Sequence, residues 1–349
     1  MQTQNPIWAL TLARLREFTR QPEALFWVYF FPVLMVLVLG VAFRNKPQET
    51  IAIDVLQNDF SESVTSHLEE SKTFKITVVD EQESKQRLRT GKTLLLITAN
   101  DASLQSIDYQ FDPARPGSTM ARNDVDQTLQ RAAGREDVIA TTNVEFQEPG
   151  GRYVDFLVPG LLAMGLMGGG LWGVGFAIVD MRIRKVLKRF MATPMKRTHF
   201  LIAMMCSRLV FMWPQIIILL VFSYFVFGVQ IYGNWLSIAL IILLGAIQFA
   251  GIGLLVASRA KTLETVSGLM NLVMLPMWTL CGIFFSYENF PEIFHPFIRW
   301  LPLTPIIDAL RALMNEGRSI TTLWFELGVM AVWAVVPFFV ALLIFRWND

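Results

Sequence analysis

Apolar and polar positions along this chain are separated into long blocks. Six blocks have the length of about 20 apolar residues that a helix needs to cross the hydrocarbon core of a bilayer. They are Ala24–Phe43, Val154–Val179, Leu209–Val229, Trp235–Ala257, Thr265–Tyr287 and Leu327–Phe345. A polar, charge-rich stretch lies between the first two blocks. The pattern therefore predicts a membrane protein: an all-α six-helix transmembrane bundle with one inserted soluble domain.

The first block could also be a cleaved signal peptide, because Gly40-Val41-Ala42 offers small residues at the spacing of a cleavage site. A signal peptide has an apolar region of about 7–15 residues, and this block is longer. We therefore expect a retained helix over 23–44.

The inserted stretch, 45–152, predicts a small α/β domain because short strand patterns alternate with helical ones. The expected strands are Thr50–Leu56, Phe74–Val79, Thr93–Thr98, Gln105–Phe111 and Asn143–Gln147. The expected helices are Ser61–Glu70, Glu81–Arg89 and Ser118–Ala133.

Composition supports the membrane assignment and charge gives it an orientation. Hydrophobic residues make up 53% of the chain and charged residues 17%, against about 25% charged in soluble proteins. Basic residues concentrate before the first block and between the second and third, and such loops face the cytoplasm. We expect a multi-pass protein of the plasma membrane (a bacterial inner membrane), with both termini cytoplasmic and the inserted domain extracytoplasmic.

The segment 1–22 predicts an amphipathic helix. Asn5 can cap it and Pro6 suits its first position. Apolar residues form a stripe beside Arg14, which is typical of a helix in the membrane interface. Such a helix could anchor the first span or could contact a cytoplasmic partner.

Several kinds of chemistry are missing from the sequence. Gly91-Lys92-Thr93 resembles the end of a phosphate-binding loop, but the glycine five residues earlier is absent and position 86 is Gln. Gly91 instead suits a helix C-terminus. Hydrolase, zinc-protease and paired-cysteine motifs do not occur, so we expect no metal site, and a net charge of +1 gives no reason to expect nucleic acid. An intramembrane enzyme is thereby disfavoured.

The central parts of the predicted spans contain no ionisable residue. Their polar side chains are limited to groups such as Gln215, Ser223, Gln248, Ser267 and Asn271. A carrier driven by protons or ions more often needs a buried charge. The chain therefore lacks an energy source of its own.

The basic loop at 181–199 is the first candidate functional segment. Apolar residues at helical spacing are surrounded by basic ones, and a Thr-Pro step follows. The candidate residues are Arg184, Val186, Leu187, Lys188, Arg189, Phe190, Met191, Thr193 and Pro194. This pattern suits a short helix lying flat on the membrane and equally one inserted in a groove of a soluble partner.

The segment 288–322 is too broken by prolines to span a membrane and too apolar to be a free loop. We expect a re-entrant element of short helices whose backbone packs on protein. Its candidate residues are Pro302, Pro305, Asp308 and Arg311, the last two spaced to form a local ion pair.

Small residues crowd the second predicted span. Gly165, Gly168, Gly169 and Gly173 permit close helix approach. This suits either packing within the bundle or a seam between two copies.

The layout resembles the permease subunits of type-2 ABC transporters, in the branch with an extracytoplasmic domain between the first two spans. The resemblance covers essentially the whole chain. Leu187–Pro194 is similar to the family's coupling helix, Trp300–Pro305 with Asp308–Arg311 to its outer segment, and Ile51–Val55 with Asp59 and Ser61 to the first strand of its outward domain.

The resemblance implies that this chain is not an enzyme and works with a separate ABC-type ATP-binding subunit, which carries ATP and Mg²⁺. It also implies a second permease copy, in a homodimer or heterodimer, within membrane lipid. One position departs from the family pattern: Lys188 stands where many members have an acidic residue. An ion pair of that residue with the ATPase is therefore not expected here.

The function expected from these features is that of a permease subunit of an ATP-driven exporter. Spans rich in Met, Phe and Trp suit an amphipathic, drug-like or lipid-like substrate, although they equally suit ordinary lipid-facing surface. The alternative is a membrane-anchored sensor or envelope assembly factor whose outward domain binds a ligand or protein.

Overall fold

The structure is a computed structural model that describes residues 6–43, 50–69, 71, 73–101, 106–115, 117–136, 139, 151–191 and 197–344. Two compact units form it. One unit comprises Met1–Arg44 with Gln147–Asp349, and the other comprises Asn45–Phe146.

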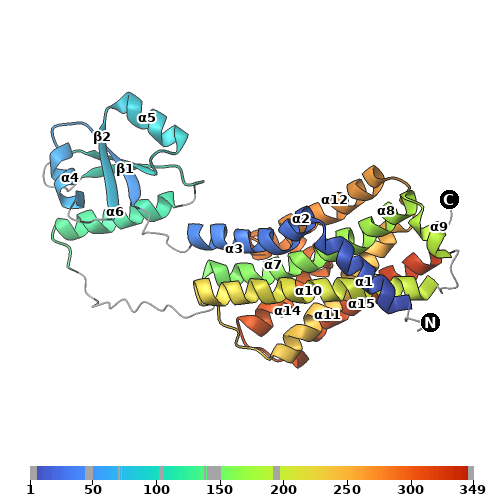
Figure 1. The fold of residues 1–349 in the computed structure, drawn as a ribbon. Helices are drawn as coiled ribbons and strands as arrows, with labels where there is room; N and C mark the ends of the chain where they lie inside the picture. Colours follow the sequence, from blue (N-terminus) through green and yellow to red (C-terminus); the bar gives the residue numbers. More distant parts are fainter. Residues whose placement is uncertain are drawn as a thin grey trace. The chain divides into compact units, whose positions relative to one another are not determined.

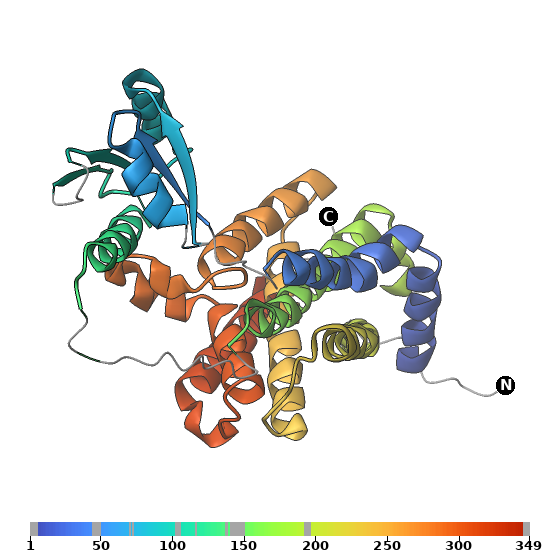
Figure 2. The ribbon, with the colours of Figure 1, turned by 90° about the vertical axis from the view of Figure 1, so that its left-hand side faces the viewer.

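The first unit is helical, and Figures 1 and 2 show its long helices running side by side. Its elements are α1 (Pro6–Thr19), α2 (Pro22–Leu25), η1 (Phe26–Phe30), α3 (Phe31–Ala42), α7 (Tyr153–Gly170), η2 (Leu171–Phe176), α8 (Ala177–Ile183), α9 (Val186–Met191), α10 (Arg197–Phe227), α11 (Trp235–Ala257), α12 (Leu263–Leu280), η3 (Tyr287–Asn289), η4 (Glu292–Phe294), α13 (His295–Trp300), α14 (Thr304–Met314), η5 (Ile320–Thr322) and α15 (Trp324–Ile344).

Five helices in the described part of the chain are long and apolar enough to cross a membrane. They are Pro22–Ala42, Tyr153–Ile183, Ile202–Phe227, Trp235–Ala257 and Trp324–Ile344. The remaining predicted span, Thr265–Tyr287, corresponds to α12, which ends at Leu280 before a turn at Gly282 with φ 82°. The membrane character is confirmed, and the count of six spans is not.

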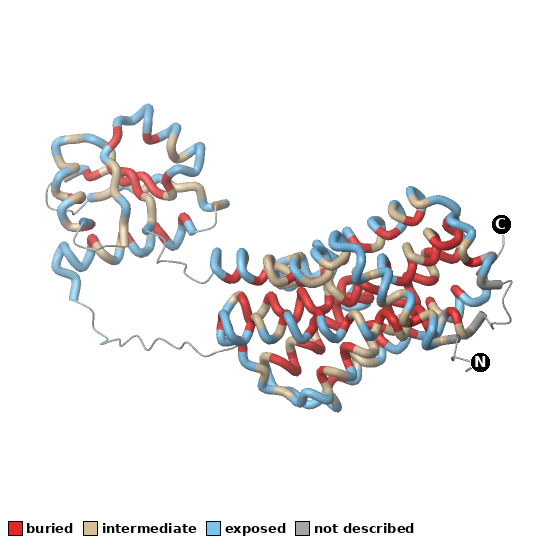
Figure 3. Tube along the Cα trace, viewed as in Figure 1, coloured by how far each residue is buried: buried red, intermediate tan, exposed pale blue. Residues whose placement is uncertain are grey.

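Two helices form the centre of the bundle. Each span has a most apolar window of 18 residues. The buried share of that window is 61% in the span that contains α7 and 67% in α11, against 17% in the first span. Figure 3 shows this buried strip along the inside of the bundle. A Cβ on Gly253 of α11 would collide with the Gly170 carbonyl of α7, so glycine is what allows these two backbones to touch. The outer helices turn apolar faces outward, as a bilayer requires.

The second unit is a small α/β fold. Its elements are β1 (Ile51–Leu56), α4 (Ser61–Glu69), β2 (Phe74–Val79), α5 (Glu81–Thr90), β3 (Leu95–Ala99), β4 (Ile107–Gln110) and α6 (Ser118–Ala132). The sheet order is β2-β1-β3-β4, with β4 antiparallel to β3 and the other pairs parallel. Its core packs β1 and β3 against α4 and α6 through side chains such as Ile53, Ile97, Leu68 and Leu129.

Most predicted elements of this unit are confirmed. Gly91 ends α5 with φ 75°, which supports the C-terminal role assigned to it over a phosphate loop. The third strand begins two residues later than predicted, because the Thr93 hydroxyl bonds the carbonyls of Ala52 and Leu95 at the strand's start. The strand predicted at Asn143–Gln147 lies outside the described residues.

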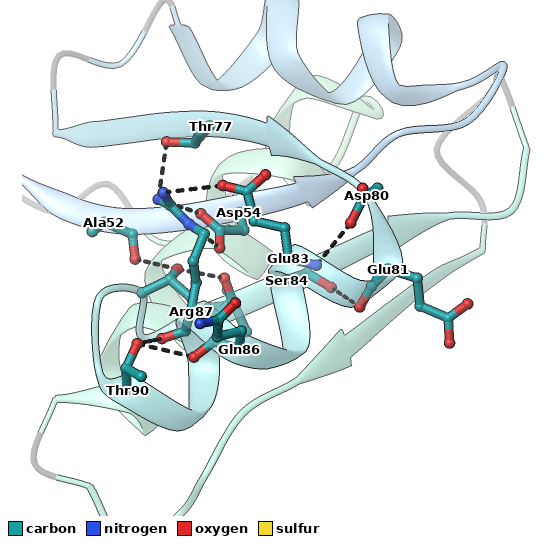
Figure 4. A network of polar contacts seen from close by, with 12 residues as sticks. Ala52, Asp54, Thr77, Asp80, Glu81, Glu83, Ser84, Gln86, Arg87 and Thr90 are labelled. Carbon is teal, nitrogen blue, oxygen red and sulfur yellow. Dashed lines mark hydrogen bonds and ion pairs between the residues drawn. The ribbon is translucent and has the colours of Figure 1, made fainter.

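A buried ion pair fixes α5 against the sheet (Figure 4). The carboxylate of Asp54, fully buried on β1, accepts two hydrogen bonds from Arg87 at 2.9 and 3.0 Å. The same guanidinium donates to the Thr77 hydroxyl on β2 at 3.3 Å. Asp54 raises the pKa of Arg87 further by accepting these bonds. One arginine thus ties α5 to two neighbouring strands.

Candidate functional site

The basic loop predicted as one segment over 181–199 is three pieces of structure. α8 ends at Ile183, α9 is the short helix Val186–Met191, and α10 already begins at Arg197. Lys185 separates the first two with φ 56°, a left-handed conformation uncommon for a residue with a Cβ. We call the end of the bundle that carries α9 the loop end, and the end at Phe43, Tyr153 and Phe227 the insertion end.

The side chains of α9 divide between the bundle and its surface. Leu187 is buried and Val186 half-buried, both against the main core, whereas Arg189 is exposed. Arg184, also exposed, pairs with Asp180 at 2.9 Å. The side chains of Lys188, Phe190 and Met191 are outside the described set, and so are Thr193 and Pro194 altogether. The helix is therefore anchored by one apolar residue and presents a basic one outward.

Arg182 connects this loop to the centre of the bundle. It is buried on α8, and its Nη1 donates to the carbonyls of Ala257 at 3.1 Å and Ala260 at 2.8 Å. These carbonyls lie at and just beyond the C-terminus of α11, where a cation is favourable. Arg182 therefore joins α8 to the end of α11.

Three of the four candidate glycines face α10 within this chain. A Cβ on Gly169 would overlap the guanidinium of Arg208, a Cβ on Gly173 would contact the same side chain at 3.4 Å, and a Cβ on Gly165 would overlap Gln215. Nothing lies within 4 Å of a Cβ placed on Gly168. The stripe therefore makes room for polar side chains of the neighbouring helix.

Arg208 corrects the prediction of an uncharged membrane core. α10 starts 12 residues before the predicted span, so Arg208 falls inside the apolar window Ile202–Phe227. It is 7% exposed, and its Nη2 donates to the Gly165 carbonyl of α7 at 3.1 Å. A charge in such a window is costly and is a candidate functional group.

The segment that follows α12 is held by three side chains that satisfy its free carbonyls. Thr304 donates to Ile298 O at 2.7 Å, Gln248 of α11 to Pro302 O at 2.6 Å, and Trp333 of α15 to Trp300 O at 2.8 Å. Irregular backbone at membrane depth needs such partners. Pro302 precedes α14, and Pro305 lies in the first turn of that helix.

Asp308 and Arg311 do not form the predicted ion pair. Arg311 donates to the Phe156 carbonyl at 3.2 Å and to the Gly282 carbonyl, and its guanidinium lies 3.5 Å from the centre of the Phe156 ring. Asp308 accepts from the Tyr287 hydroxyl at 3.3 Å. Burial raises the pKa of Asp308 to about 6, against the lowering effect of Arg311. Arg311 is instead bonded to one carbonyl in the first turn of α7 and to one just after α12, and it thereby joins these two segments.

Arg152 connects two helices at the insertion end. Arg152 binds the buried carboxylate of Asp155 at 2.9 and 3.0 Å and donates to the carbonyls of Phe227 and Gly228 at the end of α10. The pKa of the Arg152 guanidinium is raised because Asp155 accepts its hydrogen bonds. The start of α7 is thereby tied to the end of α10.

The N-terminal helix α1 packs on α10 instead of standing free. The rings of Phe18 and Phe211 lie 4.1 Å apart, and Arg14 Nε contacts Met204 Sδ at 3.3 Å. Trp8 on the opposite side is exposed. This arrangement fits the predicted amphipathic helix, with an apolar surface left for lipid or a partner.

Sequence reasoning missed the roles of Arg208, Gln248 and Arg182. Arg208 lies at the edge of an apolar run. A charge at that place normally marks the end of a span, so the pattern predicts that Arg208 lies outside the helix that crosses the membrane. Gln248 was visible as an amide within an apolar block, but its partner Pro302 is 54 residues away. In the described part of the chain no group of His, Cys, Asp or Glu could hold a metal ion.

Comparison with known protein families identifies the family of this chain. The family model described as "ABC-2 family transporter protein" matches residues 22–343. The chain belongs to the ABC-2 transporter family. ABC-2 permeases are transmembrane transport subunits that normally work with an ABC ATP-binding subunit. The resemblance noted from Leu187–Pro194 and Trp300–Pro305 is thereby confirmed at the level of the permease.

Individual relatives match parts of this ABC-2 permease. Nodulation protein J of Bradyrhizobium diazoefficiens is 33% identical over 118 residues, 33% of this chain and 45% of that protein. Inner membrane transport permease YadH of Escherichia coli is 26% identical over 190 residues, 52% and 71% of the two chains. Linearmycin resistance permease LnrN of Bacillus subtilis is 22% identical over 168 residues, 48% and 43%. The chain spans less than half the length of the nodulation proteins J that it matches.

Proposed function

We propose that this chain is the permease subunit of an ATP-driven exporter, and that ATP and Mg²⁺ bind a separate ABC-type subunit that docks on α9. Family membership supports the transport role. The observation that carries the docking site is α9 itself, where Leu187 is anchored in the bundle while Arg189 faces outward at the loop end.

The proposed coupling runs from α9 into the centre of the bundle. A partner that pushes on α9 moves α8 through the two-residue link Arg184-Lys185. α8 continues into α7 through η2, and Arg182 joins it to the end of α11. The two most buried helices are thereby linked to one surface element. Nucleotide binding would favour one arrangement of these helices over another by differential contact at α9.

Orientation and assembly belong to the same proposal. We place both termini and the loop end on the cytoplasmic side of a bacterial inner membrane and the α/β unit on the outer side. α12 with its following turn is the fifth of six spans in this proposal. A homodimer or heterodimer of permeases with two ATPases would complete the transporter. The proposal includes an amphipathic, drug-like or lipid-like substrate, which spans rich in Met, Phe and Trp would suit.

Labelling with a membrane-impermeant maleimide tests the orientation. Ser66 lies exposed on α4 and Lys261 exposed just before α12. In intact cells stripped of the outer membrane, Ser66→Cys should react and Lys261→Cys should not. The opposite pattern would invert the topology.

Co-purification tests the partnership. The full chain, extracted in mild detergent, should retain an ABC ATP-binding subunit, and Arg189→Glu on the exposed side of α9 should abolish the permease's stimulation of its ATPase activity while leaving the elution profile unchanged. Arg318→Glu, the matched substitution at the insertion end, should have no effect. Transport by the purified chain without any ATPase would refute the proposal.

A further inference from the structure

An open cavity of about 420 Å³ lies beside α13 at the insertion end. Glu292, His295, Pro296, Arg299, Trp300 and Phe325 line it. Its volume is within the roughly 300–1,000 Å³ of small-molecule sites. Five of the lining residues come from η4 and α13, and Phe325 comes from the start of α15.

The cavity contains both signs of charge without an internal ion pair. The ion pairs among the described residues include neither Glu292 nor Arg299, and both side chains belong to exposed residues. The Arg299 guanidinium is held 5.9 Å from the centre of the Phe325 ring. His295 Nε2 donates to the Phe290 carbonyl at 2.9 Å, which fixes the ring and leaves Nδ1 for another partner. An acidic and a basic side chain in one cavity suit a ligand that is itself zwitterionic.

Three large apolar residues that are adjacent in sequence to cavity-lining residues are exposed in the described part of the chain. Ile293, Phe297 and Trp324 are 82%, 60% and 76% exposed. Contiguous exposed apolar surface marks contact with protein or membrane, and Trp at a helix end is typical of the membrane interface. On a membrane permease of the ABC-2 family, such a surface suits contact with a lipid leaflet. The occupant therefore has acyl chains as well as a zwitterionic headgroup.

We propose that this cavity binds the headgroup of a phospholipid of the phosphatidylethanolamine class. Arg299, with a guanidinium suited to phosphate, binds the phosphate diester. The carboxylate of Glu292 accepts hydrogen bonds from the primary ammonium, which the trimethylated ammonium of phosphatidylcholine cannot donate. The acyl chains lie along Phe297 and Ile293. The site does not depend on the exporter proposal, because it requires only that the chain is a membrane permease.

Native mass spectrometry of the delipidated full chain tests this inference, with equal amounts of phosphatidylethanolamine, phosphatidylcholine and phosphatidylglycerol added. The wild type should retain phosphatidylethanolamine over the other two by about tenfold, the ratio expected from one or two charge-assisted hydrogen bonds. Arg299→Gln should weaken all three lipids. Glu292→Gln should weaken phosphatidylethanolamine and leave phosphatidylglycerol unchanged.

A control pair and a soluble competitor sharpen the test. Glu316→Gln and Arg318→Gln alter an exposed pair that is internally matched at 3.7 Å in the same segment, and should leave lipid selectivity unchanged. Soluble phosphoethanolamine at lipid concentrations should not displace the lipid. Preference for phosphatidylglycerol, equal binding of all lipids, selectivity that survives both cavity variants, or displacement by soluble phosphoethanolamine would overturn the proposal.

Discussion

The guanidinium of Arg208 on α10 fills the space that a Cβ at position 169 of α7 would occupy, so that only glycine fits there. Arg208 is buried and donates to Gly165 on the same helix face. A buried intramembrane arginine is costly unless it is held in this way. The helix contact between α7 and α10 therefore depends on a glycine and an arginine together.

Gly169→Ala should displace Arg208 and destabilise the bundle by about 1–3 kcal/mol, the usual cost of overpacking. Gly168→Ala is the matched control one residue away, because its Cβ meets nothing within 4 Å. That variant should be as stable as the wild type, since alanine favours helix over glycine. Apparent melting temperatures in detergent compare the two, and equal losses would show that Arg208 has no special position.

Arg152→Ala should remove the ion pair with the buried Asp155 carboxylate and the hydrogen bonds that Arg152 donates at the end of α10. Breaking a buried pair costs about 3–5 kcal/mol, and the lower end applies because the Arg152 side chain is 45% exposed. Arg318→Ala removes an ion pair exposed on both sides and should cost less than about 1 kcal/mol. A smaller loss of thermal stability for Arg152→Ala than for Arg318→Ala would contradict the structure.

Arg87→Ala should loosen the α/β unit around the buried Asp54. Amide hydrogen exchange in the full chain should accelerate in β1 and β2, which Arg87 joins. Lys85→Ala removes the exposed Lys85–Glu81 pair on the same helix and should leave exchange in the sheet unchanged. Unchanged exchange in Arg87→Ala would mean that packing alone holds α5.

Asp308 should make stability depend on pH in an identifiable way. Its pKa is raised to about 6 in the folded state by burial, from 3.8. The folded state therefore binds more protons than the unfolded one between these values, and stability falls as pH rises from about 4 to 6. Asp308→Asn removes this loss and should gain about 1–3 kcal/mol at pH 7. The gain in melting temperature should shrink toward pH 4, and a gain independent of pH would exclude titration of Asp308 as its cause.

Local patterns predicted the elements of the α/β unit because each strand and helix carries its own turn and cap residues. Phe74–Val79 matches β2 at both ends, and Ser61 begins α4 as expected. The membrane blocks were found by apolar length alone, which cannot place helix ends. α10 begins at Arg197, well before its apolar run, and α12 stops at Leu280 inside its run.

The contacts that define the candidate site lie between residues distant in sequence, and this explains why they were not predicted. The spacing of Asp308 and Arg311 predicted a local pair, but acceptors on α7 and after α12 bind Arg311. The glycine stripe was recognised without its partner, because nothing in the sequence joins Gly169 to Arg208. The pattern of apolar and polar residues predicts which face of a helix or strand is buried. It does not identify the residues of other elements that pack against that face.

Site-specific photocrosslinking tests the central claim, that an ATP-binding subunit docks on α9. A photoreactive residue at Arg189, exposed on α9, should crosslink to an ABC ATPase in membranes, and one at Arg318, exposed at the insertion end, should not. Crosslinking to the ATPase from position 318 and not from position 189 would contradict the account, and so would a transporter whose activity survives with no ATPase crosslinked or co-purified.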